Sequence, residues 1–205
     1  MKNKSSLIVF LRYPVKGKVK TRLAKTTSKD FALQWYKSCV DKIIGEINKI
    51  PGIETNIFYS ESNERDKVIK WLGSNFIYSH QEGKDLGERM QNAFFSVFSH
   101  NSGKVIIIGT DIPDLNQNII IDAFERLDTN DIVLGPSIDG GYYLLGMNRL
   151  HNSLFEGIEY STPTVLSETI SKIDKLGLTF SLLPQLQDID LEDDLMKWQN
   201  KVNRI

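Results

Sequence analysis

The chain has 205 residues and a formal net charge of −1, with 40% hydrophobic and 25% charged residues. This composition is typical of one globular domain with a substantial core, here residues 1–205, and it argues against disorder. The absence of a basic excess argues against a nucleic-acid partner, and no window approaches the roughly 20 apolar residues of a membrane span. We therefore expect a cytoplasmic protein with no membrane partner. The single cysteine, Cys39, lies in an apolar helical pattern typical of a buried structural thiol.

The first half of the chain alternates strand and helix patterns. The apolar run 7–11 predicts a strand buried on both faces. Ser28 is placed to cap a long helix that Pro51-Gly52 ends, and its apolar residues recur every four positions. That stripe consists of Phe31, Trp35, Cys39, Ile43 and Ile47. Beyond it the patterns predict strands at 54–60, 76–78 and 104–109, and helices at 63–72 and 86–97.

The second half continues the same alternation. It predicts helices at 119–127, at 165–175 and from Leu191 onward, with strands at 131–134, 142–147 and 178–183. Such alternation indicates an α/β fold, a three-layer α/β/α sandwich around a mostly parallel sheet. Ligands of these sheets bind beyond the carboxyl ends of the strands. The loops after Leu11, Gly109 and Leu134 are therefore the places to look for a site.

The first of these loops, residues 12–23, carries five cations and a glycine. Backbone N–H groups around Gly17, together with Lys20 and Arg22, could hold an anion such as phosphate. The alternative is a solvated lysine-rich loop without a ligand. Val19 follows Gly17-Lys18, so the loop is not a Walker A motif, and the chain contains no G-x-G-x-x-G.

Carboxylates follow two other predicted elements. Asp111 comes directly after strand 104–109 and could hold a divalent cation that bridges phosphate oxygens, although a turn or cap role is the alternative. Asp114, beside a proline and before a helix, is more typical of a turn or N-cap. The late acidic run complements the dipole of the last helix, but Asp188 and Asp190 precede that helix. A pairing of Asp111 with Asp190 would suit Mg²⁺, which takes one or two protein carboxylates.

Two glycine-containing segments complete the set. Residues 81–90 place Gly83 and Gly87 near a helix start, where a base or ribose could approach closely. Residues 135–146, GPSIDGGYYLLG, form either a plain corner between two strands or the rim of a site. Geometry alone does not require the acidic Asp139 in that corner.

Taken in order, these motifs resemble a known group of proteins. They are small bacterial GT-A-superfamily proteins, first catalogued as a domain of unknown function and since labelled glycosyltransferases, some of them associated with arsenosugar biosynthesis. Nucleotidyltransferases that make molybdopterin guanine dinucleotide or activate phospholactate are related to them. The resemblance spans nearly all of the chain and rests on residues 10–14 with 17–23, 85–90, 109–115, 135–146 and 188–195.

The resemblance implies an enzyme with the GT-A, or nucleotide-diphospho-sugar transferase, fold and a Mg²⁺ or Mn²⁺ cofactor. It implies Asp111 and Asp190 as metal ligands, with Asp188 as the alternative late carboxylate. In a transfer of this kind Lys20 would be catalytic by neutralising charge on the leaving diphosphate, and Asp139 would either act as general base on an acceptor hydroxyl or only orient it. The resemblance implies nucleotide contacts from Leu11, Arg12, Gly17, Lys20, Arg22, Asp85, Gly87, Arg89 and Thr110, and a donor-sugar or acceptor side at Asp139, Gly140 and Gly141.

One position departs from the group's pattern. Leu191-Glu192 stands where a Thr-Pro pair is usual, and the loss of that cap predicts a slightly looser start of the last helix.

Three functions are compatible with the sequence. We favour a metal-dependent transferase with a nucleotide-activated donor, a glycosyltransferase that acts from a nucleoside-diphosphate sugar on a small-molecule acceptor. The alternative is a nucleotidyltransferase that joins a nucleoside triphosphate to a phosphorylated small molecule and releases pyrophosphate. The third reading is a non-catalytic nucleotide-binding module. The first two use the same loop and metal, so the residues of the site separate these two reactions poorly.

Overall fold

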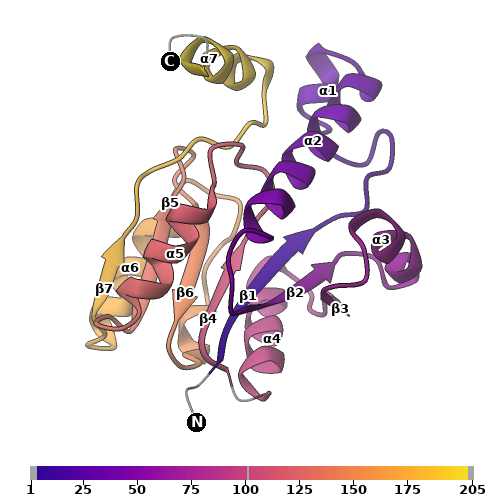
Figure 1. The fold of residues 1–205 in the computed structure, drawn as a ribbon. Helices are drawn as coiled ribbons and strands as arrows, with labels where there is room; N and C mark the ends of the chain where they lie inside the picture. The colour runs from indigo at the N-terminus through magenta and orange to yellow at the C-terminus, as the bar shows by residue number, and fades with distance from the viewer. Residues whose placement is uncertain (1–3, 101, 203–205) are drawn as a thin grey trace.

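The computed structural model describes residues 4–100 and 102–202, and one mixed sheet forms its centre. The strands are β1 (Lys4–Leu11), β2 (Ile53–Tyr59), β3 (Ile77–His80), β4 (Ser102–Ile108), β5 (Ile132–Pro136), β6 (Tyr142–Met147) and β7 (Phe180–Leu182). Within the described residues they lie in the order β3-β2-β1-β4-β6-β5-β7 (Figure 1). Only β6 in this sheet runs antiparallel to its neighbours, so the predicted mostly parallel sheet is confirmed.

Helices cover both faces of the sheet, as the alternation predicts. They are α1 (Leu23–Thr26), α2 (Lys29–Ile47), α3 (Arg65–Leu72), α4 (Leu86–Phe98), α5 (Gln117–Arg126), α6 (Val165–Lys175) and α7 (Glu192–Val202), with 3₁₀ turns at Ser62–Glu64 and Asn152–Leu154. Residues of α2, α3 and α5 pack on the face that Leu7 and Val9 of β1 present, and residues of α4 and α6 pack on the face of Ile8. None of the helices in these residues is long and apolar enough to cross a membrane.

Helix α2 begins as predicted but turns a different face to the sheet. The Ser28 hydroxyl caps it, accepting from the Phe31 N–H at 3.0 Å. The predicted stripe is wrong at its start, because Phe31 is 41% exposed and Trp35 is only partly buried. Each step of four residues turns roughly 40° beyond a full helical turn, so a strict four-residue spacing drifts off the core face. The buried residues are Ala32, Tyr36, Cys39, Val40, Ile43, Ile44 and Ile47.

The Cys39 thiol lies in that buried face of α2. Burial raises the pKa of Cys39 to about 12, so the thiol stays protonated at neutral pH. The predicted burial of this cysteine is confirmed.

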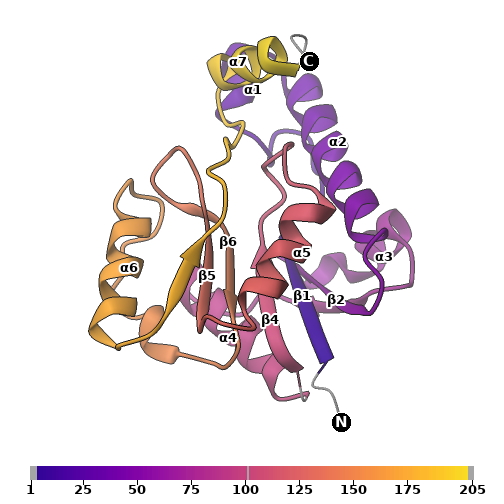
Figure 2. The same cartoon turned by 60° about the vertical axis from the view of Figure 1, so that its left-hand side comes forward.

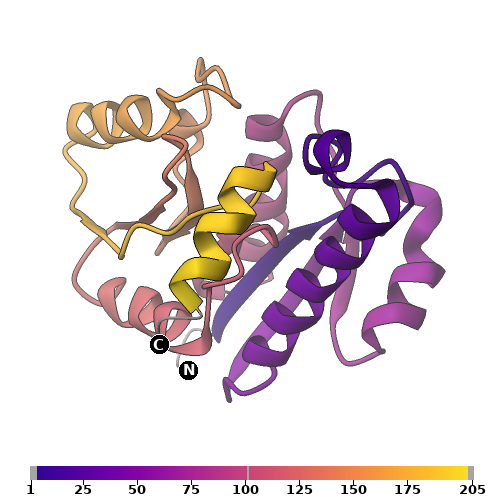
Figure 3. The same cartoon turned by 90° about the horizontal axis from the view of Figure 1, so that it is seen from above.

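The last helix docks beside α1 and α2, beyond the carboxyl ends of the strands (Figure 2 and Figure 3). The Trp198 ring meets Trp35 edge-on at 5.3 Å, and its Nε1–H donates to the Asp114 carboxylate at 2.7 Å. Lys201 pairs with the same carboxylate at 2.7 Å. Asp114 is therefore an anchor for α7. It lies in the predicted turn, which the Leu115 N–H closes by donating to the Ile112 carbonyl oxygen, but it is not the N-cap of α5, because Asn116 is.

Loss of the Trp198 side chain should weaken the packing of α7 beside α1 and α2. Trp198→Ala removes both the aromatic contact and the hydrogen bond to Asp114, so we expect the free energy of unfolding to fall by about 2–3 kcal/mol in urea denaturation. Trp198→Phe keeps a ring against Trp35 and should cost about 1 kcal/mol. Equal losses in the two variants would contradict the contribution of the ring contact.

Candidate functional site

A cleft of about 600 Å³ opens where β1 and β4 end. Three segments that are far apart in the sequence line it: the cation-rich loop after β1, residues 107–112 at the end of β4, and residues 137–143 between β5 and β6. Two late carboxylates, Asp188 and Asp190, complete the wall. The cleft thus lies at the edge of the sheet where the strand-end rule places ligands.

Most of the residues singled out in the sequence meet in this cleft. Those that line it are Leu11, Arg12, Lys20, Arg22, Arg89, Thr110, Asp111, Asp139, Gly141 and Asp190. Four others do not line it: Gly17, Asp85, Gly87 and Gly140. The predicted set therefore divides into residues that line the cleft and residues that shape the segments around it.

Two of the four residues that do not line the cleft have local backbone roles. Gly17 has a φ of +78°, so it makes a turn in the first loop that a residue with a Cβ would strain. The Asp85 carboxylate caps α4 by accepting from the Glu88 N–H at 2.9 Å. Both residues position the segments that carry the cleft-lining cations.

The other two permit close packing around the cleft. A Cβ on Gly87 would overlap the Tyr160 ring, and a Cβ on Gly140, where φ is +90°, would overlap the Pro163 carbonyl oxygen. These glycines let residues 160–165 approach α4 and the corner at 137–141. Their small size serves protein packing at these two positions.

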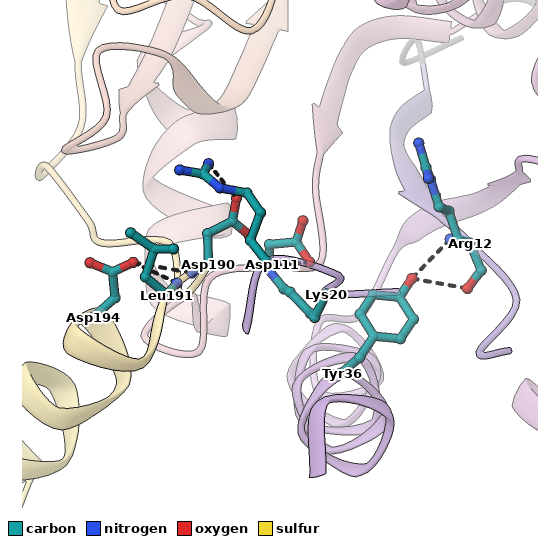
Figure 4. Close-up of polar contacts among 8 residues, drawn as sticks. Arg12, Lys20, Tyr36, Asp111, Asp190, Leu191 and Asp194 are labelled. Carbon is teal, nitrogen blue, oxygen red and sulfur yellow. Dashed lines mark hydrogen bonds and ion pairs between the residues drawn. The ribbon is translucent and has the colours of Figure 1, made fainter. Parts of the chain in front are cut away.

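Lys20 lies at the centre of the polar groups in the cleft (Figure 4). Its Nζ is 3.1 Å from Asp111 Oδ1 and 2.8 Å from Asp190 Oδ1, while an Arg22 nitrogen lies 3.4 Å from Asp190 Oδ2. The Ile189 N–H also donates to the Asp111 carbonyl oxygen at 3.3 Å. Lysine and both predicted metal carboxylates therefore form one cluster, assembled from three segments.

The charge of this lysine is fixed by its neighbours. The Lys20 side chain is 3% exposed, and burial alone would lower the pKa of its ammonium. The charges of Asp111 and Asp190 outweigh that penalty and hold the pKa of Lys20 above its ordinary value. Lys20 also adopts a φ of +45°, a left-handed conformation that costs a residue with a Cβ about 1–2 kcal/mol. The ion pairs hold the residue in this geometry.

Asp190 is held at its backbone by the first turn of α7. The Asp194 carboxylate accepts from the Leu191 N–H at 2.9 Å and from the Asp190 N–H at 3.3 Å (Figure 4). The sequence predicts a loose start of this helix because the usual Thr-Pro pair is missing. Asp194 satisfies N–H groups there and so supplies the cap that Leu191 cannot provide.

The opposite wall of the cleft carries two further carboxylates. Asp139 Oδ1 accepts from the Gly141 N–H at 3.0 Å and from the Ser137 hydroxyl, which fixes the carboxylate in the corner. Burial, and then the charges of Asp139 and Asp190, raise the pKa of Asp188 to about 6. The negative charges of this wall therefore repel one another.

Sequence patterns missed two polar residues in the cleft. The Tyr36 hydroxyl accepts from the Arg12 N–H at 2.8 Å and donates to the Arg12 carbonyl oxygen at 2.9 Å, which holds the start of the first loop. The buried Gln81 donates from Nε2 to the carbonyl oxygens of Phe58, at 2.8 Å, and Leu11, at 3.3 Å. These bonds fix the orientation of the Gln81 amide and leave Oε1 as its hydrogen-bond acceptor. A polar residue directly after β3 was the available signal for Gln81.

Sequence patterns also missed residues 160–162, which line the cleft. Tyr160, Ser161 and Thr162 line it together with Tyr142. Ser161 has a φ of +68°, the other positive φ besides Lys20 among the non-glycine residues described. The Leu166 N–H donates to the Gly140 carbonyl oxygen at 2.9 Å, which ties this segment to the corner.

Solved structures place the fold among nucleotide-diphospho-sugar transferases. The chain is similar to a "putative nucleotide-diphospho-sugar transferase" from Desulfovibrio desulfuricans G20, with 32% identity over 93% of this chain and 84% of that one, at a TM-score of 0.90. A 4-diphosphocytidyl-2C-methyl-D-erythritol synthase from Anaerococcus prevotii DSM 20548 shares the fold at 9% identity, over 98% of this chain and 96% of the other, with a TM-score of 0.66. A CMP:2-keto-3-deoxy-manno-octonic acid synthetase complexed with CTP shares it at 10% identity, over 98% and 99%, with a TM-score of 0.59.

The family follows from the sequence itself. A model described as "Uncharacterized protein conserved in bacteria (DUF2064)" matches residues 43–162, more than half of the chain. The chain belongs to this family, and the resemblance seen in its motifs is confirmed. A search of curated proteins found no match.

The raised pKa of Asp188 gives a testable pH dependence. A carboxyl group whose pKa is about 6 when folded and 3.8 when unfolded adds stability below pH 3.8 and loses that contribution as the pH rises through 6. Asp188→Asn should therefore raise the Tm at pH 8 by roughly 1–3 °C, a small gain because solvent screens a half-buried group, and should change it little near pH 4. Thermal denaturation at both pH values measures this.

The exposed Asp128, which pairs with Lys104 far from these carboxylates, offers the control. Asp128→Asn should bring no gain at pH 8. A gain from Asp188→Asn that is equal at pH 4 and pH 8 would contradict the electrostatic origin.

Proposed function

We propose that this chain is a metal-dependent glycosyltransferase that takes a nucleoside-diphosphate sugar as donor and a small molecule as acceptor. The observation that carries the proposal is the cluster of Lys20, Asp111 and Asp190 inside the cleft at the ends of β1 and β4. Buried charge of this kind in a cleft is typical of a functional site. The 32% identical relative, described as a nucleotide-diphospho-sugar transferase, supports the same class of donor.

The residues fit a divalent cation, Mg²⁺ or Mn²⁺. Asp111 and Asp190 both reach one ammonium group, so the two carboxylates are already arranged around a compact positive charge. The described residues contain no group of three or more His, Cys, Asp or Glu side chains suited to a metal. Mg²⁺ needs no such group, because it takes one or two protein carboxylates and completes its shell with phosphate oxygens and water. When bound, it would neutralise charge on the donor's diphosphate.

The cations of the first loop would bind that diphosphate. Lys20 and Arg22 present charged donors at the cluster, and the Arg12 backbone is held in place by Tyr36. As the bond between the sugar and the diphosphate breaks, the electron pair leaves with the nucleoside diphosphate, and negative charge grows there. A fixed, buried ammonium such as Lys20 stabilises that charge without reorganising. Lys20 is catalytic in this sense.

Asp139 is placed to act on the acceptor. In the proposed step an acceptor hydroxyl gives its proton to the Asp139 carboxylate, and its oxygen forms the new bond to the anomeric carbon of the sugar. The hydrogen bonds from Ser137 and Gly141 engage Oδ1, which leaves Oδ2 for the acceptor. The base of the donor would lie toward Gln81 and Arg89, where the fixed Gln81 Oε1 can accept from a base N–H group.

The alternative function is nucleotidyl transfer, in which a phosphorylated acceptor attacks a nucleoside triphosphate. One of the structures with this fold is complexed with CTP, and this favours a nucleoside triphosphate as the second candidate donor. The same cations and carboxylates would serve that reaction. The products separate the two: glycosyl transfer releases a nucleoside diphosphate, and nucleotidyl transfer releases pyrophosphate.

A thermal-shift panel tests nucleotide binding. Sugar nucleotides and nucleoside triphosphates, each with and without Mg²⁺ or Mn²⁺, should include one that raises the Tm by several degrees, since a ligand at a hundred times its Kd adds about 2.7 kcal/mol. Asp111→Asn should abolish the metal-dependent part of this shift, and Lys20→Ala should lower it with or without metal. The exposed Asp128→Asn is the matched control and should behave like the wild type. If no nucleotide shifts the wild type in any metal, the proposal fails.

Chromatography of a reaction mixture tests the type of transfer. With the donor found in the panel, we expect a nucleoside diphosphate to accumulate, and we expect Asp139→Asn to slow its release about 100-fold or more through loss of the base. Release of pyrophosphate from a nucleoside triphosphate would instead establish the alternative function.

A further inference from the structure

The two walls of the cleft carry opposite charge. The wall built by residues 10–90 contributes cations and no carboxylate, and the wall built by residues 137–190 contributes carboxylates and no Lys, Arg or His, among the described residues that line the cleft. The cations are Arg12, Lys18, Lys20, Arg22 and Arg89, and the carboxylates are Asp139, Asp188 and Asp190. Asp111 of the central segment and Lys20 meet at the boundary between the walls.

Binding of the donor's diphosphate would explain the ion pairs at the boundary between the two walls. It would not explain the unpaired carboxylates of the wall built by residues 137–190, the acidic wall. Asp190 is engaged by Lys20 and Arg22, and Asp111 is engaged by Lys20. Asp139 and Asp188 have no cation paired with them among the described residues of the cleft. They line the same cleft as Ser161 and Tyr142. This wall therefore offers hydrogen-bond acceptors, hydroxyl groups and aromatic surface.

We propose that the second substrate of this protein is an uncharged polyhydroxylated molecule, such as a sugar or polyol, and not a phosphate ester. Carboxylates accept hydrogen bonds from hydroxyl groups, and these bonds are stronger than those between neutral groups. A phosphate placed beside Asp139 and Asp188 meets like charge instead, and even with solvent screening this costs an anion at least about tenfold in affinity. A phosphorylated acceptor would need cations on this wall, and the wall supplies none.

This inference rests on the proposed function and narrows it. A neutral hydroxyl acceptor fits glycosyl transfer, in which the hydroxyl must lose a proton and a nearby carboxylate can take it. It does not fit attack by a phosphate on a nucleoside triphosphate. The acidic wall thus separates the two candidate reactions, which the cationic wall serves equally well.

Charge reversal at Asp139 tests the proposal, with inorganic phosphate as the probe. The full chain is first saturated with Mg²⁺ and the nucleoside diphosphate that gives the largest thermal shift, so that the cationic wall is occupied. Phosphate binding to this complex is then measured by ³¹P NMR in wild type, Asp139→Lys and Asp139→Asn. We expect no binding by the wild type, and at least about tenfold tighter binding by Asp139→Lys than by Asp139→Asn.

Two results would overturn the proposal. Binding of phosphate by the wild-type complex would show that the wall accepts an anion. Failure of all three proteins to bind phosphate would show that the Asp139 carboxylate is not what excludes it. Retention of the nucleotide-induced thermal shift in each variant verifies that the fold and the donor site are intact.

A screen of acceptors in matched pairs gives an independent answer. Glucose with glucose 6-phosphate and ribose with ribose 5-phosphate are tested for donor consumption. Product from a phosphorylated member without product from its uncharged partner would contradict the inference. The outcomes also separate the two levels of the argument: if no nucleotide binds at all, the proposed function fails, whereas nucleotide binding followed by acceptance of phosphate overturns only the inference about the acceptor.

Discussion

The buried ammonium of Lys20 is the interaction on which the rest of the site depends. An isolated charge with 3% exposure would be strongly unfavourable, so Lys20 requires both of its carboxylate partners in place. One partner, Asp190, lies 170 residues away in the chain. The contacts around this cluster serve to hold the partners: Ile189 bonds to the Asp111 backbone, and Asp194 caps the turn that carries Asp190. Packing of α7 by its tryptophan secures that turn in the same way.

Much of the fold could be predicted from the sequence because its central strands are buried on both faces. Runs such as those in β1 and β4 are continuous and apolar, and their alternation with helices specifies a layered α/β fold. The strand-end rule then located the cleft. Other features depend on contacts between segments that are distant in the sequence, and no sequence periodicity indicates them. Gln81 matters because its amide meets carbonyl oxygens at the ends of two neighbouring strands, and Asp114 because a distant helix returns to it.

Glycine shows most clearly where sequence reasoning about a site reaches its limit. A glycine in a motif indicates that something approaches its Cα closely, but not whether this is a ligand or the protein itself. Gly141 lines the cleft, whereas its neighbour Gly140 makes room for the Pro163 carbonyl group, and Gly87 makes room for Tyr160. Both cases look alike along the chain. Only the packing of residues 160–165, which no pattern indicated, distinguishes them.

The net charge of the cluster of Lys20, Asp111 and Asp190 determines how a bound cation and a bound diphosphate affect each other's affinity. Lys20 with Asp111 and Asp190 carries one net negative charge, so this cluster alone would repel a diphosphate. A divalent cation held there, as in the proposed function, reverses that sign. Cation and diphosphate would then each strengthen the binding of the other, by the same factor in both directions. In the proposed function Asp139 and Asp188 stay outside this exchange, and the cleft would hold an anionic leaving group and a neutral acceptor side by side.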